Sequence, residues 1–216
     1  VGVMGLLDDT PSMATVDAYP TINLWESSNE PYFHQVDVVA WARTTRDFGR
    51  AFKQRYPAKM LVIPMLAQSN GGDYQQPAGT WKPWVTHVFD AAPDIGQYFD
   101  GWGAHPYSHG GPPSLTLLDK VRAQLVARGF TKPCYVTEIG WSVGTSTVPS
   151  QRQVTAAQQA QYLREFVEQA RTRSWIEQIY VYSLRSWGTA FEPSFGLFEP
   201  DNTTERPAAA VFRGLV

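Results

Sequence analysis

The chain has 216 residues, of which 43% are hydrophobic and 18% charged, and its net charge is -2. This length and composition predict one globular domain over residues 1–216 and exclude a disordered chain. Without a basic excess, nucleic acid and anionic membranes are not expected as partners, and no apolar run approaches the length of a membrane span.

Strand and helix signals alternate along the chain. Apolar runs rich in β-branched and aromatic residues predict strands at residues 1–7, 22–25, 60–66, 99–104, 134–137 and 179–184. Helical spacing of apolar residues predicts helices at residues 35–56, 83–92, 118–129, 155–170 and 207–215. The Gly-, Asn- and Gln-rich stretch 68–80 is expected to be a loop.

Several residues mark the ends of these elements. Pro83 suits the first turn of a helix, and Gly129 suits the position just after a helix ends. Thr155 and Gln158 have the spacing of a capping box, which predicts a helix start.

The alternation of strands and helices predicts the fold class. It is typical of a parallel α/β sheet with right-handed crossovers. A closed eight-strand barrel needs about 250 residues, so six strands indicate an incomplete (β/α)8 TIM-barrel-like fold or an open sheet. The family resemblance described below implies that the missing strands are the first ones.

Other signals limit the chemistry and the compartment. Cys134 is the only cysteine, so no internal disulfide forms, and we expect a buried apolar role for it. No metal-ligand spacing, phosphate-binding loop or Gly-x-Ser-x-Gly motif is present, and we predict no metal and no cofactor. No signal peptide is visible, but many secreted enzymes lack disulfides, so the localisation stays open.

Two glutamates each follow an apolar strand. Glu30 lies in Asn29-Glu30-Pro31, and Glu138 lies in the segment that continues to Trp141. Carboxyl ends of parallel strands meet at one edge of a sheet, so the two carboxylates are predicted to face each other across a cleft. Such a pair is what cleavage of a glycosidic bond requires.

Four elements in this order resemble clan A glycoside hydrolases, which are retaining TIM-barrel enzymes such as the cellulase-type family 5 and the β-xylosidase-type family 39. They are Asn29-Glu30-Pro31, His105-x-Tyr107, Thr137-Glu138-x-Gly140-Trp141 and the strand-end Trp187. The resemblance covers roughly residues 20–216. It implies an O-glycoside hydrolase that acts on a β-linked sugar or polysaccharide.

The resemblance also implies roles for the polar residues. Glu30 is the acid/base and Glu138 the nucleophile, with their carboxyl groups about 5–5.5 Å apart. Asn29 binds the sugar 2-hydroxyl, Tyr107 donates a hydrogen bond to Glu138, and His105 contacts a substrate hydroxyl. The alternative for each is structural: a helix cap or surface salt bridge for Glu30, a turn for Asn29 and a buried ion pair for Glu138. For Tyr107 it is a core tyrosine with a satisfied hydroxyl, and for His105 a hydrogen-bonded structural histidine.

Two tryptophans are predicted to contact substrate. Trp187 is expected to stack under the sugar next to the scissile bond, and Trp141 to line the cleft. Core packing is the alternative for both.

The N-terminal part departs from the family. Only 28 residues precede Asn29, whereas clan A barrels place three βα units there. A fragment, a naturally reduced monomeric barrel, and a homo-oligomer that covers the open sheet edges all explain this departure. A non-catalytic carbohydrate-binding or structural protein on a degenerate barrel is the main rival function, and a transglycosylase is a third.

Overall fold

The computed structural model describes residues 3–8, 10–32, 34, 36–67, 73–75, 81–108, 110–144, 153–186, 194–201 and 203–215. The chain divides into two compact units. The first comprises residues 1–104 and 117–135, and the second comprises residues 105–116 and 136–216. The boundary between the units runs through two strands, so each unit contains part of both.

The first unit is built on a parallel sheet. Strands β1 (Met4–Leu6), β2 (Leu24–Glu26) and β3 (Met60–Ala67) pair in parallel. Strand β6 (Gly101–His105) follows β3 in the sheet, and the first residues of β7 (Cys134–Ile139) follow β6. A separate antiparallel pair joins β4 (Asp73–Gln75) and β5 (Trp81–Pro83).

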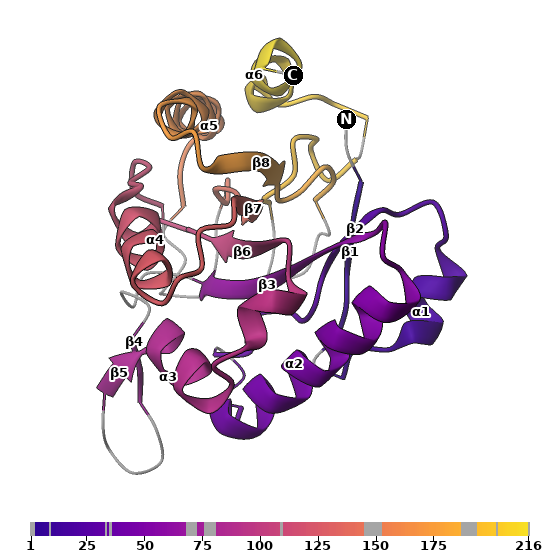
Figure 1. Cartoon of the computed structure of the whole chain (residues 1–216). Coiled ribbons are helices and arrows are strands. Elements are labelled where there is room, and N and C mark those ends of the chain that lie inside the picture. The colour runs from indigo at the N-terminus through magenta and orange to yellow at the C-terminus, as the bar shows by residue number, and fades with distance from the viewer. Residues whose placement is uncertain are drawn as a thin grey trace. The chain divides into compact units, whose positions relative to one another are not determined.

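Helices accompany the strands of the first unit in the alternation that the sequence predicts. They are α1 (Met13–Ala18), α2 (Val38–Arg55), α3 (Trp84–Ala91), the 3-10 helix η1 (Ile95–Tyr98) and α4 (Thr116–Ala127). Helix α2 contacts both α3 and η1 (Figure 1). It buries the face on which Trp41, Thr45 and Phe52 lie, as its 3-4 spacing predicts.

Local capping decides where these helices begin and end. The Asp37 carboxylate accepts hydrogen bonds from the first backbone N–H groups of α2. After α4 the chain turns at Gly129, whose φ is +78°, and the Phe130 N–H donates to the Leu125 carbonyl at 2.9 Å. Only glycine adopts this left-handed conformation at little cost, which confirms the predicted helix stop.

The second unit contains the rest of β7, strand β8 (Ile176–Val181), and helices α5 (Ala156–Arg171) and α6 (Pro207–Leu215). The two helices pack against each other (Figure 1). The Tyr182 N–H donates to the Ile139 carbonyl at 2.9 Å and links the ends of β7 and β8. Strand β7 is almost entirely buried, whereas every residue of β8 is half-buried or exposed.

The six predicted strands are confirmed, with ends that shift by a few residues. Six strands (β1, β2, β3, β6, β7 and β8) make an α/β fold consistent with an incomplete TIM-like barrel. One expectation needs correction: the predicted loop 68–80 contains β4. Between β1 and β2, where the sequence predicts no element, lies the six-residue α1, capped by the Ser12 hydroxyl. No helix within the described ranges is long and apolar enough to cross a bilayer.

Candidate active site

Strand β7 positions Glu138 at its carboxyl end. The first four residues of β7 are buried, whereas the Glu138 side chain is 21% exposed, so the strand holds the backbone firmly and leaves the carboxylate partly accessible. Gly140 follows two residues later, where the chain passes against the Tyr182 carbonyl. The carboxylate is thus presented at the edge of the sheet where α/β enzymes place their catalytic groups.

Tyr107 donates a hydrogen bond to Glu138. Its hydroxyl lies 2.8 Å from Oε2 of the carboxylate. A hydroxyl that donates to a carboxylate favours the ionised form. This is the contact that the sequence predicts between the two side chains.

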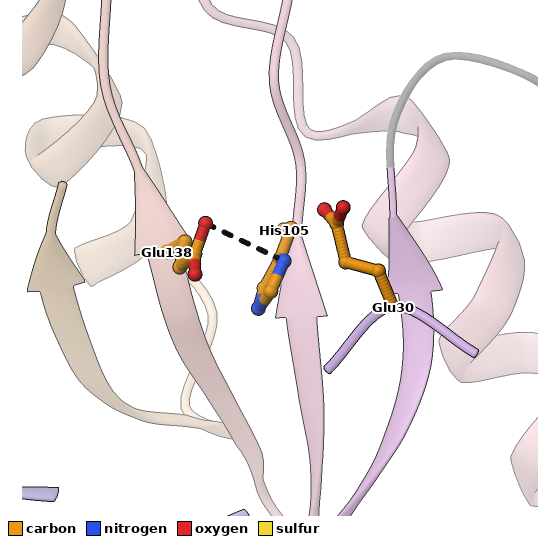
Figure 2. A group of neighbouring side chains, drawn as sticks. All are labelled: Glu30, His105 and Glu138. Carbon is orange, nitrogen blue, oxygen red and sulfur yellow. Dashed lines mark ion pairs between the residues drawn. The ribbon is translucent and has the colours of Figure 1, made fainter. Parts of the chain in front are cut away.

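His105 faces the same carboxylate oxygen. Its Nδ1 lies 3.6 Å from Oε2 of Glu138, an ion pair whenever the imidazole is protonated (Figure 2). The ring is 2% exposed. His105 and Tyr107 lie two residues apart, and their rings meet edge to face with centroids 6.5 Å apart. His105, Tyr107 and Glu138 therefore form one cluster inside the second unit.

A second aromatic ring, that of Phe195, also packs against Tyr107. Phe195 packs edge-on against the Tyr107 ring with centroids 5.9 Å apart, and it packs in the same way against Tyr182 at 5.6 Å. The stack joins the segment after β8 to the donor of Glu138. Phe195 is not recognisable from the sequence, because no motif distinguishes it from the other phenylalanines of the chain.

Trp141 lies deeper than a cleft-lining residue would. It is 2% exposed, and its ring packs against Tyr162 and Phe166 of α5. Its indole N–H donates to the Ser108 hydroxyl and to the Gly111 carbonyl, both at 2.9 Å. In this position the side chain anchors the loop that follows Tyr107. The predicted contact with substrate stays a prediction.

Asn29 and Glu30 belong to the first unit, directly after β2. All residues from Leu24 to Ser28 are buried, and the two residues that follow are half-buried. Glu30 has a φ of +42°, the only positive φ of a non-glycine residue in the described part of the chain. A left-handed backbone at a non-glycine residue is energetically costly, and such residues cluster at functional sites.

A second carboxylate precedes Glu30. Glu26 is 1% exposed at the end of β2, so it lies within the core of the first unit. Its charge acts on Cys134 of the same unit. Burial first, and the Glu26 charge second, raise the pKa of the Cys134 thiol well above its usual range. The buried cysteine is therefore a poor nucleophile, as its place in a predicted strand indicates.

The remaining predicted residue, Trp187, lies outside the described residues. Gln159 of α5 is buried and donates hydrogen bonds to the Trp141 and Phe195 carbonyls, which the sequence does not reveal. Its sequence position reads as an ordinary polar residue in the first turn of a helix.

Comparisons with known proteins identify the fold. No protein-family model matches the chain, and no curated protein matches it either. Among solved structures, a GH128 endo-β-1,3-glucanase from Amycolatopsis mediterranei in complex with laminaritriose is 18% identical. The match has a TM-score of 0.63 and covers 100% of this chain and 83% of that one. A family 39 glycoside hydrolase from Bacteroides cellulosilyticus is 21% identical with a TM-score of 0.61, and 92% of this chain covers 42% of it.

Larger glycosidases share the same fold over part of their length. A GH2 β-galacturonidase from Eisenbergiella tayi is 13% identical with a TM-score of 0.61, and 93% of this chain covers 34% of it. The chain thus spans about a third of the length of that enzyme. All these neighbours are glycoside hydrolases, and at this level of identity the likeness shows that the chain shares their fold.

Proposed function

We propose that the chain is a retaining glycoside hydrolase that cleaves β-glycosidic bonds of an oligo- or polysaccharide. The observation that carries the proposal is the environment of Glu138, a strand-end carboxylate that accepts a hydrogen bond from Tyr107 at 2.8 Å beside the buried His105. A nucleophilic carboxylate must be ionised and held in one orientation, and the hydroxyl donor provides both.

The first step forms a covalent intermediate. Glu138 attacks the anomeric carbon, and the glycosidic oxygen leaves as an alcohol after it takes a proton from Glu30. In the second step Glu30 removes a proton from water, the resulting hydroxide attacks the anomeric carbon, and the bond to Glu138 breaks. The anomeric configuration is inverted twice and is therefore retained.

The other predicted residues have supporting roles in this proposal. Asn29 adjoins the acid/base and would bind the sugar 2-hydroxyl. Trp187 would stack under the sugar. Trp141 holds the loop after Tyr107 through its hydrogen bonds to Ser108 and Gly111. We therefore propose that Trp141 affects substrate binding by fixing the position of that loop.

The first substrate to test is a β-1,3-glucan. A solved neighbour that covers 100% of this chain is an endo-β-1,3-glucanase. A suitable panel contains linear β-1,3- and β-1,4-glucans, mannan, xylan and aryl β-glycosides, with the Glu138→Gln variant as a paired control. Circular dichroism of both proteins checks that the control is folded.

Two results would support the mechanism separately. Turnover that is lost in Glu138→Gln assigns the carboxylate, and a β-anomer as the first product in proton NMR assigns retention. Glu30→Ala should retain activity on aryl glycosides with good leaving groups far better than on glucans, because a good leaving group needs no proton. A folded wild-type protein that binds glucan but turns over no substrate would refute the proposal and favour the carbohydrate-binding alternative.

A further inference from the structure

A buried glutamine links two segments of the second unit. Gln159 lies in the first turn of α5 and is 3% exposed. Its amide nitrogen donates to the Trp141 carbonyl at 2.9 Å and to the Phe195 carbonyl at 3.1 Å, and it lies 3.5 Å from the Gly196 carbonyl. One side chain therefore joins the loop after β7 to the segment after β8.

Both of these segments lead to the donor of Glu138. The Phe195 ring packs on the Tyr107 ring at 5.9 Å. On the other path, the Trp141 indole N–H donates to Ser108, the residue next to Tyr107. The position of the Tyr107 hydroxyl is thus fixed by two routes, and both begin at the Gln159 amide.

The choice of an amide at this position is not explained by packing. Neighbouring core positions of α5 carry Leu163 and Phe166, and an apolar side chain would fill the space at lower cost. Burial of a polar group is unfavourable unless it is hydrogen-bonded. The Gln159 carbonyl oxygen has no hydrogen-bond partner within the described part of the chain, so part of that cost is not recovered. The two carbonyls that the amide nitrogen holds explain why the residue is polar.

We infer that Gln159 is a positioning residue for Glu138. It holds Trp141 and Phe195, and through them it keeps the Tyr107 hydroxyl within hydrogen-bond distance of the carboxylate. The inference rests on the proposed function for the catalytic role of Glu138, but the geometry it describes does not depend on that role.

The test compares Gln159→Leu, Tyr107→Phe and the double variant. The readout is the titration of the Glu138 carboxyl group, because this measurement requires no substrate. Carbon-13 NMR monitors the titration, and the signal that is absent from Glu138→Gln is assigned to Glu138. The acid limb of kcat/KM is measured in parallel. Gln161→Leu is the matched control, since Gln161 is an exposed glutamine of the same helix that binds only Glu165 in the described structure.

The two single variants should shift the titration in the same direction. Tyr107→Phe removes a hydrogen bond to a carboxylate, which should raise the titration midpoint by about one pH unit. Gln159→Leu should raise it by at least about half as much, and the double variant should match Tyr107→Phe alone, because both changes act through one contact. The acid limb of kcat/KM should move by the same amounts, whereas Gln161→Leu should move neither.

Other outcomes would overturn the inference. If Gln159→Leu lowers the unfolding temperature but leaves the midpoint of the Glu138 titration at its wild-type value, the role of Gln159 is purely structural. Shifts that add in the double variant show two independent effects. Should Gln159→Leu fail to fold, Phe195→Leu tests the same route, and an unchanged midpoint there refutes it. A folded wild-type protein without turnover refutes the proposed function, while the titration still decides the role of Gln159.

Discussion

Replacement of Gly140 by alanine tests the close approach of two strands beside Glu138. A Cβ atom at this position would lie 2.0 Å from the Tyr182 carbonyl oxygen and 3.1 Å from Cδ1 of Phe195. The first contact is with backbone, which cannot rotate away as a side chain does. Either the end of β7 or the end of β8 must move.

The size of the movement sets the expected loss of stability. Non-bonded heavy atoms are most stable about 3.5–4.0 Å apart, so the strands must separate by more than ~1 Å. This separation stretches the 2.9 Å hydrogen bond from the Tyr182 N–H to the Ile139 carbonyl. Overpacking of a core costs about 1–3 kcal/mol, and loss of the hydrogen bond adds about 1 kcal/mol. The total of about 2–4 kcal/mol should lower the unfolding temperature of a chain of this length by about 4–16 °C.

A second glycine provides the matched control. Gly214 lies in α6, and no atom lies within 4 Å of the position its Cβ would take. Alanine in a helix is more favourable than glycine by about 0.5–1 kcal/mol. Thermal and urea unfolding should therefore show Gly140→Ala below the wild type and Gly214→Ala at or above it.

The same substitution should also reduce catalysis. Glu138 is two residues from Gly140, and a displacement of about 1 Å at a reacting group costs on the order of 100-fold in rate. Hydrolysis of the best substrate should fall by at least about tenfold in Gly140→Ala and stay unchanged in Gly214→Ala. A Gly140→Ala variant that is as stable and as active as the wild type would show that the close approach is not required.

Three further predictions concern single side chains. Trp141→Phe should lower the free energy of unfolding by about 1–2 kcal/mol or more in urea titrations, because the donor to Ser108 and Gly111 is lost and the smaller ring packs less well. Glu30→Gly should have a free energy of unfolding about 1 kcal/mol higher than that of Glu30→Ala, and so a higher unfolding temperature, since glycine adopts the φ of +42° without strain. Asp201 has its pKa lowered from 3.8 to about 2 by hydrogen bonds, the largest from Thr204. Because its folded pKa lies below the unfolded value, the stability it contributes is present above pH 3.8 and is lost as the pH falls toward 2. NMR titration of its carboxyl group should show a midpoint near 2.

The sequence predicts the strands and the helix ends because these depend on short-range physics. The buried run from Met60 and the capping box of Thr155 and Gln158 are recognisable without knowledge of the fold. The contact of Tyr107 with Glu138 was predicted through a family resemblance, and the structure contains it.

Tertiary packing determines what the sequence did not reveal. Trp141 is equally suited to a cleft and to a core, and only the position of α5 places its ring in the core. Gln159 has two other glutamines, Gln158 and Gln161, within two residues of it. Nothing local shows that Gln159 alone reaches two backbone carbonyls from distant segments.

The single cysteine allows local unfolding of this chain to be measured by the rate of thiol labelling. Cys134 is 0% exposed, and burial raises its thiol pKa, so a thiol reagent cannot modify it while β7 remains packed. The rate of labelling then reports how often the first unit opens enough to release the start of β7. Since β7 continues from Cys134 to Glu138, the labelling rate also reports on the strand that carries the proposed nucleophile, and no cysteine has to be introduced.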